Sequence, residues 1–274
     1  MRIESRRIGD GDDRVAVVIP VKNIDDDITR KCLDHLAKTS KLPLEVFLVE
    51  SSGDEFSFGR SINAGIEAAK AYGVVVCMDS DAFPSPEAFP ELLRCLKEMP
   101  NLGYAAAVAS SPNAHPNIGW AHMNLPWFLI YSLKHRAPLY AIRRLMIGGW
   151  WTFGVRNPKN YIPGKMVGAS TTTFAIRRAC FDDVGPLDER FKVSFSDQDL
   201  CFRIMISNAW YLTSCPSARV YHEEHVTRKV PKEEVEFKDW RLFLEKWPRQ
   251  KIKEVLTAAA HGKFTIIKNE NGDA

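Results

Sequence analysis

Short runs of β-branched and other apolar residues alternate along the chain with segments of helical periodicity, and this alternation constrains the fold more than any other feature. The runs predict strands at Val15–Pro20, Leu44–Val49, Val74–Met78, Tyr104–Val108 and Ser170–Ile176, with shorter strands at Trp210–Thr213 and Arg219–Tyr221. The periodic segments predict helices at Ile24–Thr39, Phe58–Tyr72, Phe89–Met99 and Asp199–Asn208. Strands that alternate with helices indicate an α/β fold with an open, mostly parallel sheet.

Other segments are less uniform. Residues 113–165 are rich in proline, glycine and aromatic residues and have no clear periodicity. Phe181–Phe191 is expected to be a loop because it contains a Gly-Pro pair. From Pro231 the pattern turns helical, and large apolar residues fall at i, i+3, i+4 and i+7: Trp240, Phe243, Leu244 and Trp247.

The composition excludes several classes of protein. A chain of 274 residues suits one large domain, and a formal net charge of +3 is too small for a dedicated nucleic-acid binder. The six cysteines show no CxxC spacing, so no zinc site is expected, and thiols within apolar runs suit a reducing cytosol. The N-terminus lacks the apolar core of a secretory signal, and no run reaches the roughly 18 to 20 apolar residues that span a bilayer. We therefore expect a cytoplasmic protein.

Asp79-Ser80-Asp81 directly follow the third predicted strand. Ligands of open α/β sheets bind beyond the carboxyl ends of the strands, and two aspartates one residue apart can present their carboxylates to one hard cation. Such a cation bridges and neutralises a diphosphate. The alternative is an acidic turn that caps the next helix. The position after a third parallel strand favours a metal site, which we expect in a surface turn.

Seven stretches of the chain stand in the order in which they occur in the inverting GT-A glycosyltransferases of family two, which the chain resembles. They are VAVVIPVKN (15–23), LEVFLVESSGD (44–54), SINAGIEAA (61–69), VVVCMDSDAFPSPEA (74–88), VGASTTTFAIRRACFDDVGPLDERF (167–191), SDQDLCFRI (196–204) and ARVYHEEHVT (218–227). Each stretch is weak alone, but the ordered set is specific. The resemblance implies a Rossmann-like GT-A domain over residues 1–227 and a helical C-terminal extension over residues 228–274.

The same resemblance implies an activity. It is the transfer, with inversion, of a sugar from a nucleotide-diphosphate sugar to a hydroxyl of a glycan or lipid-linked acceptor, as in a hexosyltransferase. The chain lacks the QxxRW motif and the transmembrane helices of processive synthases, so a single addition in glycan, glycolipid or cell-surface polysaccharide synthesis is expected.

Two other functions compete with sugar transfer. A nucleotidyltransferase on a similar sheet would carry a glycine-rich basic loop after the first strand, where this chain reads PVKNIDDD. A non-catalytic binding scaffold of the same fold would not need the acidic residues and the histidine that the family uses for catalysis. The sequence therefore favours the enzyme over both.

The resemblance also implies donor-binding roles for residues at matching positions: Pro20, Val21, Glu50, Asn63, Asp79, Ser80 and Arg228. Pro20 and Val21 would lie against the nucleotide base. Glu50 takes the place of the acidic residue, commonly aspartate, that recognises the base. Asn63 is explained equally well as a polar position on a helix, with no role in donor binding. Arg228 is explained equally well as part of a solvated basic turn.

The metal site implied by the resemblance consists of Asp79, Asp81 and His222, with His225 as a rival to His222. A histidine alone is more often an ordinary polar residue, so the assignment of His222 depends on the resemblance. The cofactor would be a divalent metal, Mn²⁺ or Mg²⁺, and an imidazole ligand suits Mn²⁺ better.

The proposed general base is Asp197, which lies in SDQDL at the place of the family's E-D-x-D-L. Inverting transfer needs a carboxylate that accepts the proton of the acceptor hydroxyl. Ser196 stands where the family has glutamate. Asp199 fits the cap of the following helix better than it fits catalysis.

Residues 113–165 mix aromatic with basic side chains: Trp127, Phe128, Tyr131, Tyr140, Trp150 and Trp151 with Lys134, Arg136, Arg143 and Arg144. Such a mixture suits peripheral association with a membrane, which would place the protein at the inner face. A lid over the acceptor site or a homodimer contact explains it equally well, and the three interpretations stay open.

Overall fold

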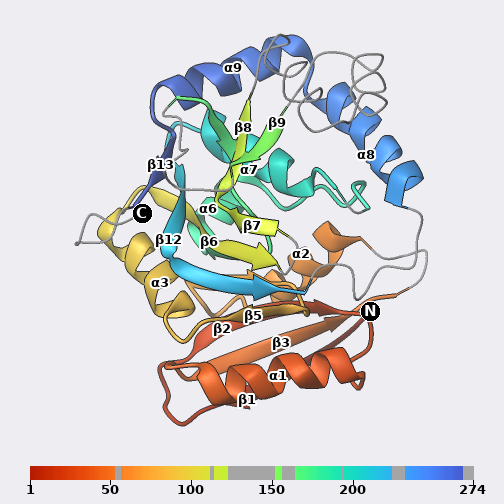
Figure 1. Cartoon of the computed structure of the whole chain (residues 1–274), viewed down its shortest axis with the longest axis vertical. Helices are drawn as coiled ribbons and strands as arrows, with labels where there is room; N and C mark the ends of the chain where they lie inside the picture. The colour runs from red at the N-terminus through yellow and green to blue at the C-terminus, as the bar shows by residue number, and fades with distance from the viewer. Residues whose placement is uncertain are drawn as a thin grey trace.

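The computed structural model describes residues 1–52, 57–111, 114–122, 152–155, 164–192, 194–223 and 232–267. The strands are β1 (Arg2–Ile8), β2 (Val15–Val21), β3 (Leu44–Glu50), β4 (Val74–Met78), β5 (Ala82–Pro84), β6 (Leu102–Ser111), β7 (Ala114–Asn117), β8 (Gly119–His122), β9 (Thr152–Val155), β10 (Met166–Gly168), β11 (Thr173–Arg177), β12 (Tyr211–His222) and β13 (Phe264–Ile266). The helices are α1 (Asp27–Thr39), α2 (Phe58–Ala68), α3 (Ala88–Glu98), α6 (Arg178–Val184), α7 (Ser196–Ile206), α8 (Lys232–Lys246) and α9 (Arg249–Ala260). In Figure 1, α1 lies at the lower end of the molecule and α8 and α9 lie at the upper end.

One large mixed sheet runs through the molecule in the order β1-β3-β2-β4-β11-β6-β12-β13, with β7 beside β6 and β5 beside β12. The strands β3, β2 and β4 are parallel to one another, as are β6, β12 and β13. Strand β11 runs antiparallel between β4 and β6. The predicted α/β fold with its parallel strands is confirmed, and the antiparallel pairings of β1, β5, β7 and β11 make the sheet mixed.

Both faces of this sheet are covered, which explains why its strands are continuous apolar runs. In β2, Ala16 and Val18 belong to a core shared with α2 and the later helices, whereas Val17 and Ile19 belong to a core shared with α1 and α3. All four side chains are fully buried. The predicted helices therefore cover the sheet from two sides.

The charged N-terminal segment forms β1, which the sequence pattern does not predict. This strand pairs antiparallel with β3, from Arg2 opposite Glu50 to Ile8 opposite Leu44. It lies at the edge of the sheet, and more than half of its residues are exposed. An edge strand with one neighbour needs no apolar run, so its sequence carries little strand signal.

Two predictions near the C-terminal part of the sheet are wrong in their limits. Part of the predicted loop Phe181–Phe191 is helical, because α6 continues to Val184. Gly185, with a φ of +83°, is its C-cap. A helix of two turns is too short to show periodicity. Helix α7 begins at Ser196 rather than Asp199.

Four cysteines are buried free thiols, as the apolar runs predict: Cys32, Cys77, Cys180 and Cys201. The other two, Cys95 of α3 and Cys215 of β12, lie side by side in the core although 120 residues separate them in sequence. No local spacing predicts a pair that the fold brings together from so far apart.

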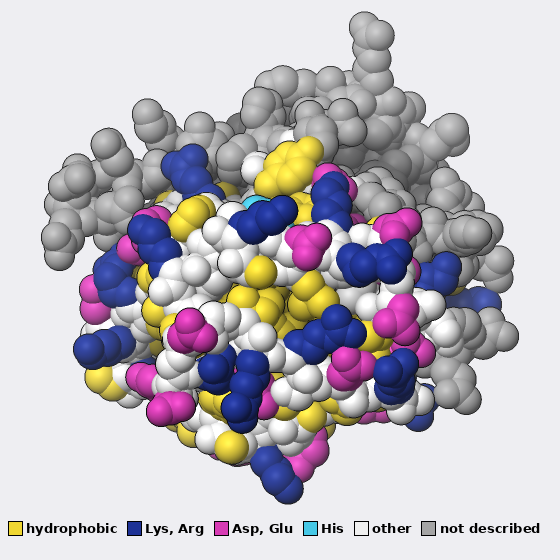
Figure 2. All heavy atoms as spheres, turned by 90° about the horizontal axis from the view of Figure 1, so that it is seen from below, with side chains coloured by type: hydrophobic (Ala, Val, Ile, Leu, Met, Phe, Trp, Pro, Cys, Tyr) yellow, Lys and Arg dark blue, Asp and Glu magenta, His cyan; other side chains and the backbone are white. Residues whose placement is uncertain are grey.

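The surface at the lower end of the molecule carries interspersed charges. Figure 2 shows lysine and arginine side chains mixed with aspartate and glutamate there, rather than gathered in one basic stripe. In the described part of the chain, no helix combines the length and apolar character needed to cross a bilayer. Most of the aromatic and basic segment, residues 123–151, lies outside the described residues, and its described flanks form β7, β8 and β9.

Gly65 lies where α2 comes closest to the sheet. A Cβ added there would lie 2.2 Å from Val18 Cγ1 and 3.0 Å from Val49 Cγ2. We expect Gly65→Ala to overpack this contact and to lower the free energy of unfolding by about 1–3 kcal/mol, measured by urea denaturation. Gly73→Ala is the control, since a Cβ there meets no atom within 4 Å. Equal stability of the two variants would contradict the packing argument.

Candidate active site

The carboxyl end of β4 leads directly into Asp79-Ser80-Asp81. The Asp79 N–H donates to the Thr172 carbonyl at 2.9 Å, and the Asp79 carbonyl accepts from the Ala82 N–H at 3.2 Å. Beyond this turn, β5 pairs antiparallel with β12, and Ala82 lies opposite His222. The pairing brings His222 beside Asp81 although 141 residues separate them in sequence.

The three predicted metal ligands lie together. His222 Nε2 is 3.1 Å from Asp81 Oδ1 and 3.6 Å from Asp79 Oδ2. One ligand atom from each of the three residues lies within 4.8 Å of the others. Carboxylate oxygens with one imidazole nitrogen suit Mn²⁺ and can also hold Mg²⁺. The chemistry of this donor set therefore fits the divalent metal that the sequence implies.

The prediction of an exposed surface turn is wrong for this segment. Asp81 is 5% exposed and Ser80 is 7% exposed. They are covered because β5 and β12 pair over the turn, where the Glu223 N–H donates to the Asp81 carbonyl at 3.0 Å. Asp79 is more open, with 30% of its side chain exposed. Asp79 is thus the carboxylate that an incoming ligand can reach most easily.

Glu50 lies at the end of β3, and Val21 lies opposite it at the end of β2. The Glu50 carboxylate accepts a hydrogen bond from the Ile24 N–H at 3.0 Å. Pro20 and Val21 are buried beside it. A cavity of about 300 Å³ adjoins this point and is lined by Met1, Arg2, Glu50, Ser51, Ser52 and Arg60. The structure therefore brings together the residues to which the resemblance assigns the nucleotide base.

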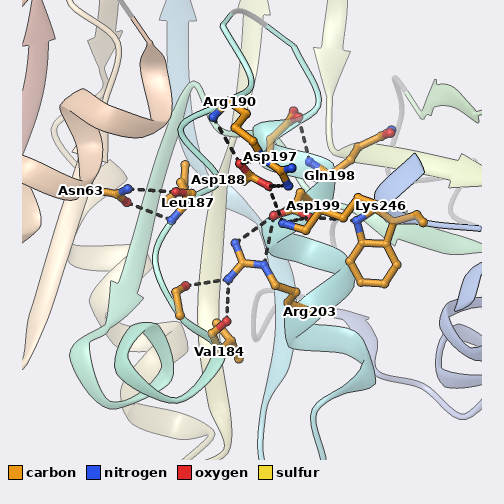
Figure 3. A network of polar contacts seen from close by, with 12 residues as sticks. Asn63, Val184, Leu187, Asp188, Arg190, Asp197, Gln198, Asp199, Arg203 and Lys246 are labelled. Carbon is orange, nitrogen blue, oxygen red and sulfur yellow. Dashed lines mark hydrogen bonds and ion pairs between the residues drawn. The ribbon is translucent and has the colours of Figure 1, made fainter. Parts of the chain in front are cut away.

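Asn63 connects α2 to the segment before α7 (Figure 3). Its Nδ2 donates to the Leu187 carbonyl at 2.9 Å and to Glu189 Oε1 at 3.0 Å, and its Oδ1 accepts from the Leu187 N–H at 2.9 Å. Both ends of the amide are engaged by the chain itself. These contacts favour the structural interpretation of Asn63, and its donor-binding role stays a prediction.

Asp197 is the second residue of α7. Its Oδ1 accepts a hydrogen bond from the Gln198 N–H at 2.8 Å. Burial raises the pKa of the Asp197 carboxyl above its ordinary value, and hydrogen bonds from the backbone oppose the rise. A carboxylate with a raised pKa accepts a proton more readily near neutral pH.

Tyr104 is a buried side chain that contacts the segment holding Asp79. Burial raises the pKa of the Tyr104 hydroxyl well above its ordinary value, and the negative charges of Asp197 and Asp79 add to the rise. The hydroxyl donates to the Ser170 carbonyl at 2.8 Å, two residues before the Thr172 carbonyl that holds Asp79. The segment from Ser170 to Thr172 therefore contacts both the Tyr104 hydroxyl and the main chain of Asp79.

Asp199 does not cap α7, contrary to the prediction. The N-cap position is Phe195, four residues before Asp199, and Asp199 lies within the helix. Asp199 is completely buried. Its Oδ2 lies 3.0 Å from Arg203 Nε and Nη2, and its Oδ1 lies 2.8 Å from Lys246 Nζ and 2.9 Å from Trp247 Nε1. Asp199 thus joins α7 to the C-terminal helices.

The remaining predicted residues divide into two groups. Arg228 and His225 lie outside the described residues, so their roles stay predictions. Asp188, Asp239 and Lys246 also contact the segment around α7, although no motif in the sequence points to them. A single charged residue in a polar helix carries no signal of a distant partner, so no sequence pattern could have found them.

Comparison with known proteins decides the family. The sequence matches the profile of glycosyl transferase family 2 over residues 24–185, which is more than half of the chain. The chain belongs to glycosyl transferase family 2. A comparison with curated protein sequences gives no match.

Solved structures of glycosyltransferases share the GT-A fold of this family member. One is GalNAc-T7, determined with UDP, GalNAc and Mn²⁺, with 14% identity and a TM-score of 0.52 over 87% of this chain and 50% of that chain. Another is TarS 1-349 from S. aureus, with 13% identity and a TM-score of 0.52 over 91% of this chain and 71% of that chain. The chain thus spans half the length of GalNAc-T7, and at these identities the likeness concerns the fold.

The raised pKa of Asp197 makes the stability of this family 2 protein depend on pH. Aspartate in an unfolded chain has a pKa of about 3.9, so the group's contribution to stability is full below that pH and is lost as pH rises through the higher folded pKa. Asparagine cannot ionise, and it keeps an acceptor for the Gln198 N–H. We therefore expect the melting temperature of Asp197→Asn, relative to wild type, to increase from about pH 4 to about pH 8.

Thermal unfolding followed by circular dichroism across this range is the measurement. Each kcal/mol regained corresponds to roughly 2–4 °C for a chain of this size. Asp34→Asn, at an exposed position of α1, is the control and should show no such trend. A difference between Asp197→Asn and wild type that stays flat with pH would mean that burial does not perturb Asp197.

Proposed function

We propose that this family 2 protein transfers a sugar from a nucleoside-diphosphate sugar to an acceptor hydroxyl, with inversion and with the help of a divalent metal, Mn²⁺ or Mg²⁺. The observation that carries the proposal is the convergence of Asp79, Asp81 and His222 within 4.8 Å at the carboxyl end of β4. GalNAc-T7, which shares the fold, was determined with UDP, GalNAc and Mn²⁺. That likeness supports the choice of donor class and metal.

The donor would lie along the carboxyl ends of the parallel strands. Glu50 and Val21 end β3 and β2 and would meet the nucleotide base, while Asp79, Asp81 and His222 would hold the metal. When bound, the metal would offset the negative charge of the departing diphosphate. Asp79 has the more exposed carboxylate of the two and would be the one nearest the diphosphate.

Asp197 would act as the general base. The acceptor oxygen forms a bond to the anomeric carbon while the bond from that carbon to the diphosphate breaks, and the hydroxyl proton passes to Asp197. Oδ1 already accepts a hydrogen bond from the Gln198 N–H, so we assign the proton to Oδ2. The raised pKa of this carboxyl supports the assignment.

The acceptor we propose is a glycan or a lipid-linked sugar that receives a single unit. Residues 113–165, with Arg228, would close over the acceptor and the diphosphate. For the same residues we also propose association with the inner face of a membrane and formation of a homodimer. The C-terminal extension from residue 228 would support the part of the site that contains Asp197.

The metal assignment predicts the effect of a conservative change. Asp81→Asn keeps the size of the side chain but removes the charge, so the affinity for Mn²⁺ in the presence of the preferred nucleotide should fall at least about tenfold. The preferred nucleotide comes from a thermal-shift panel of UDP-, GDP- and dTDP-sugars with Mn²⁺, in which a ligand at 100 times its Kd adds about 2.7 kcal/mol of stability. Isothermal titration calorimetry measures the affinity. Asp34→Asn is the control, and an unchanged Mn²⁺ affinity in Asp81→Asn would refute the assignment.

The base assignment predicts a loss of rate without a loss of binding. Asp197→Asn should lower kcat by about 100- to 10,000-fold, because asparagine cannot accept the proton. Its affinities for donor and metal should remain those of wild type. NMR of the product's anomeric proton checks the stereochemistry, and a product that retains the donor's configuration would overturn the mechanism, since a single in-line displacement inverts.

A further inference from the structure

Phe195 has an unusual backbone conformation directly before the proposed base. Its φ is +69°, and it is the one non-glycine residue with positive φ in the described part of the chain. Bulky residues avoid this region, and such a conformation persists where the surrounding structure enforces it. Phe195 is the N-cap of α7, two residues before Asp197. The contacts that hold Phe195 therefore also set the direction in which α7 presents Asp197.

Aromatic residues of α8 hold the Phe195 ring. Its centroid lies 5.1 Å from that of Trp240 and 5.2 Å from that of Phe243. Both partners are almost fully buried. Ring pairs at this separation add to the stability that burial alone provides.

The main chain before Phe195 is held by the same helix. Asp239 of α8 is 2% exposed, and its two carboxylate oxygens accept hydrogen bonds from separate main-chain groups. Oδ1 accepts from the Lys192 N–H at 3.0 Å, and Oδ2 accepts from the Ser194 N–H at 2.9 Å. One carboxylate therefore fixes the course of the chain as it approaches α7.

The chain after Phe195 is held from the end of α8. Lys246 Nζ lies 2.8 Å from Asp188 Oδ2 and 2.8 Å from Asp199 Oδ1 (Figure 3). Trp247 Nε1 donates to the same Asp199 oxygen at 2.9 Å. The first turn of α7 is thus tied to the C-terminal helix on the far side of Asp197.

We propose that one side of the C-terminal helix positions the general base. This α8 face consists of Asp239, Trp240, Phe243 and Lys246, whose spacing of i, i+1, i+4 and i+7 places them on one side of the helix, together with Trp247, which directly follows the helix and whose N–H donates to the Phe243 carbonyl at 2.8 Å. They are positioning residues, because their contacts are with the chain on both sides of Asp197. The inference rests on the proposed role of Asp197, and it gives a function to residues beyond the match at 24–185.

The donor and metal side of the site is built from β3, β4, β5 and β12, so a change in the α8 face should leave donor binding intact. A misplacement of a reacting group by about 1 Å can cost about 100-fold in rate. We therefore expect loss of contacts in the α8 face to lower kcat by about 10- to 100-fold, with the KM for the donor within about twofold of wild type.

Three variants test the expectation. Trp247→Phe keeps an aromatic ring against Phe202, whose centroid lies 5.0 Å away, but removes the N–H that Asp199 accepts. Lys246→Met removes the ammonium group, and Lys253→Met, at an exposed position of α9, is its matched control. Asp239→Asn replaces one of two acceptor oxygens by a donor. If Lys246→Met fails to fold, Trp247→Phe and Asp239→Asn still carry the test.

A double variant separates positioning from general damage. If the α8 face acts through Asp197, then adding Trp247→Phe to Asp197→Asn should cost less than about twofold in kcat, because the step that it assists is already lost. The inference is overturned if Trp247→Phe lowers kcat as much in the Asp197→Asn background as it does in wild type. It is also overturned if all three single variants keep the kcat of wild type, or if they change the KM for the donor instead of kcat.

Hydrogen exchange gives a readout that does not depend on activity. We expect the amides of Lys192 and Ser194 to exchange faster in Asp239→Asn than in wild type, and Lys253→Met to match wild type. Unchanged exchange overturns the inference even in an active enzyme. Absence of sugar transfer by the wild-type protein with every donor of the panel would instead defeat the proposed function, and with it the catalytic part of the inference.

Discussion

The completely buried carboxylate of Asp199 is the constraint on which the C-terminal half of the structure depends. An ion taken out of water loses several kcal/mol of hydration, and only close partners offset that loss. Arg203 supplies two nitrogen atoms at 3.0 Å, and Lys246 and Trp247 approach the other oxygen at 2.8 and 2.9 Å. Removal of one charged partner of a buried ion pair typically costs about 3–5 kcal/mol. Formation of α7 is therefore coupled to docking of the segment that follows α8.

A second long-range pairing builds the opposite side of the site. Strand β5 has three residues, yet its pairing with β12 brings His222 beside Asp81 and covers the turn that contains both aspartates of the proposed metal site. The carbonyls of Ser170 and Thr172 accept from the Tyr104 hydroxyl and from the Asp79 N–H. The segment from Ser170 to Thr172 thus ties the turn of Asp79 to β6.

The sequence predicts the elements that have a local pattern and the site residues to which the family resemblance points. The buried stretches of the parallel strands β2, β3 and β4 are almost continuously apolar, so their sequences predict them, and the resemblance points to Asp79, Asp81 and His222, which lie together. Local pattern failed for Asp199, because two acidic residues near a helix start indicate a cap whether or not the helix has already begun. It could not find the α8 face, since Asp239 and Ser194 are 45 residues apart and Lys246 and Asp188 are 58 residues apart.

One aspartate lies before α7 and two lie in its first turn, and they differ in whether a cation is paired with them. Asp188 lies against Arg190 and Lys246, whose hydrogen bonds hold its pKa well below the ordinary value. Asp199 lies against Arg203 and Lys246. Within the described part of the chain, Asp197 has no such ion pair, and burial raises its pKa. Because the two neighbouring carboxylates are paired with cations, Asp197 is the one of the three best able to accept a proton, which supports its proposed role as the base.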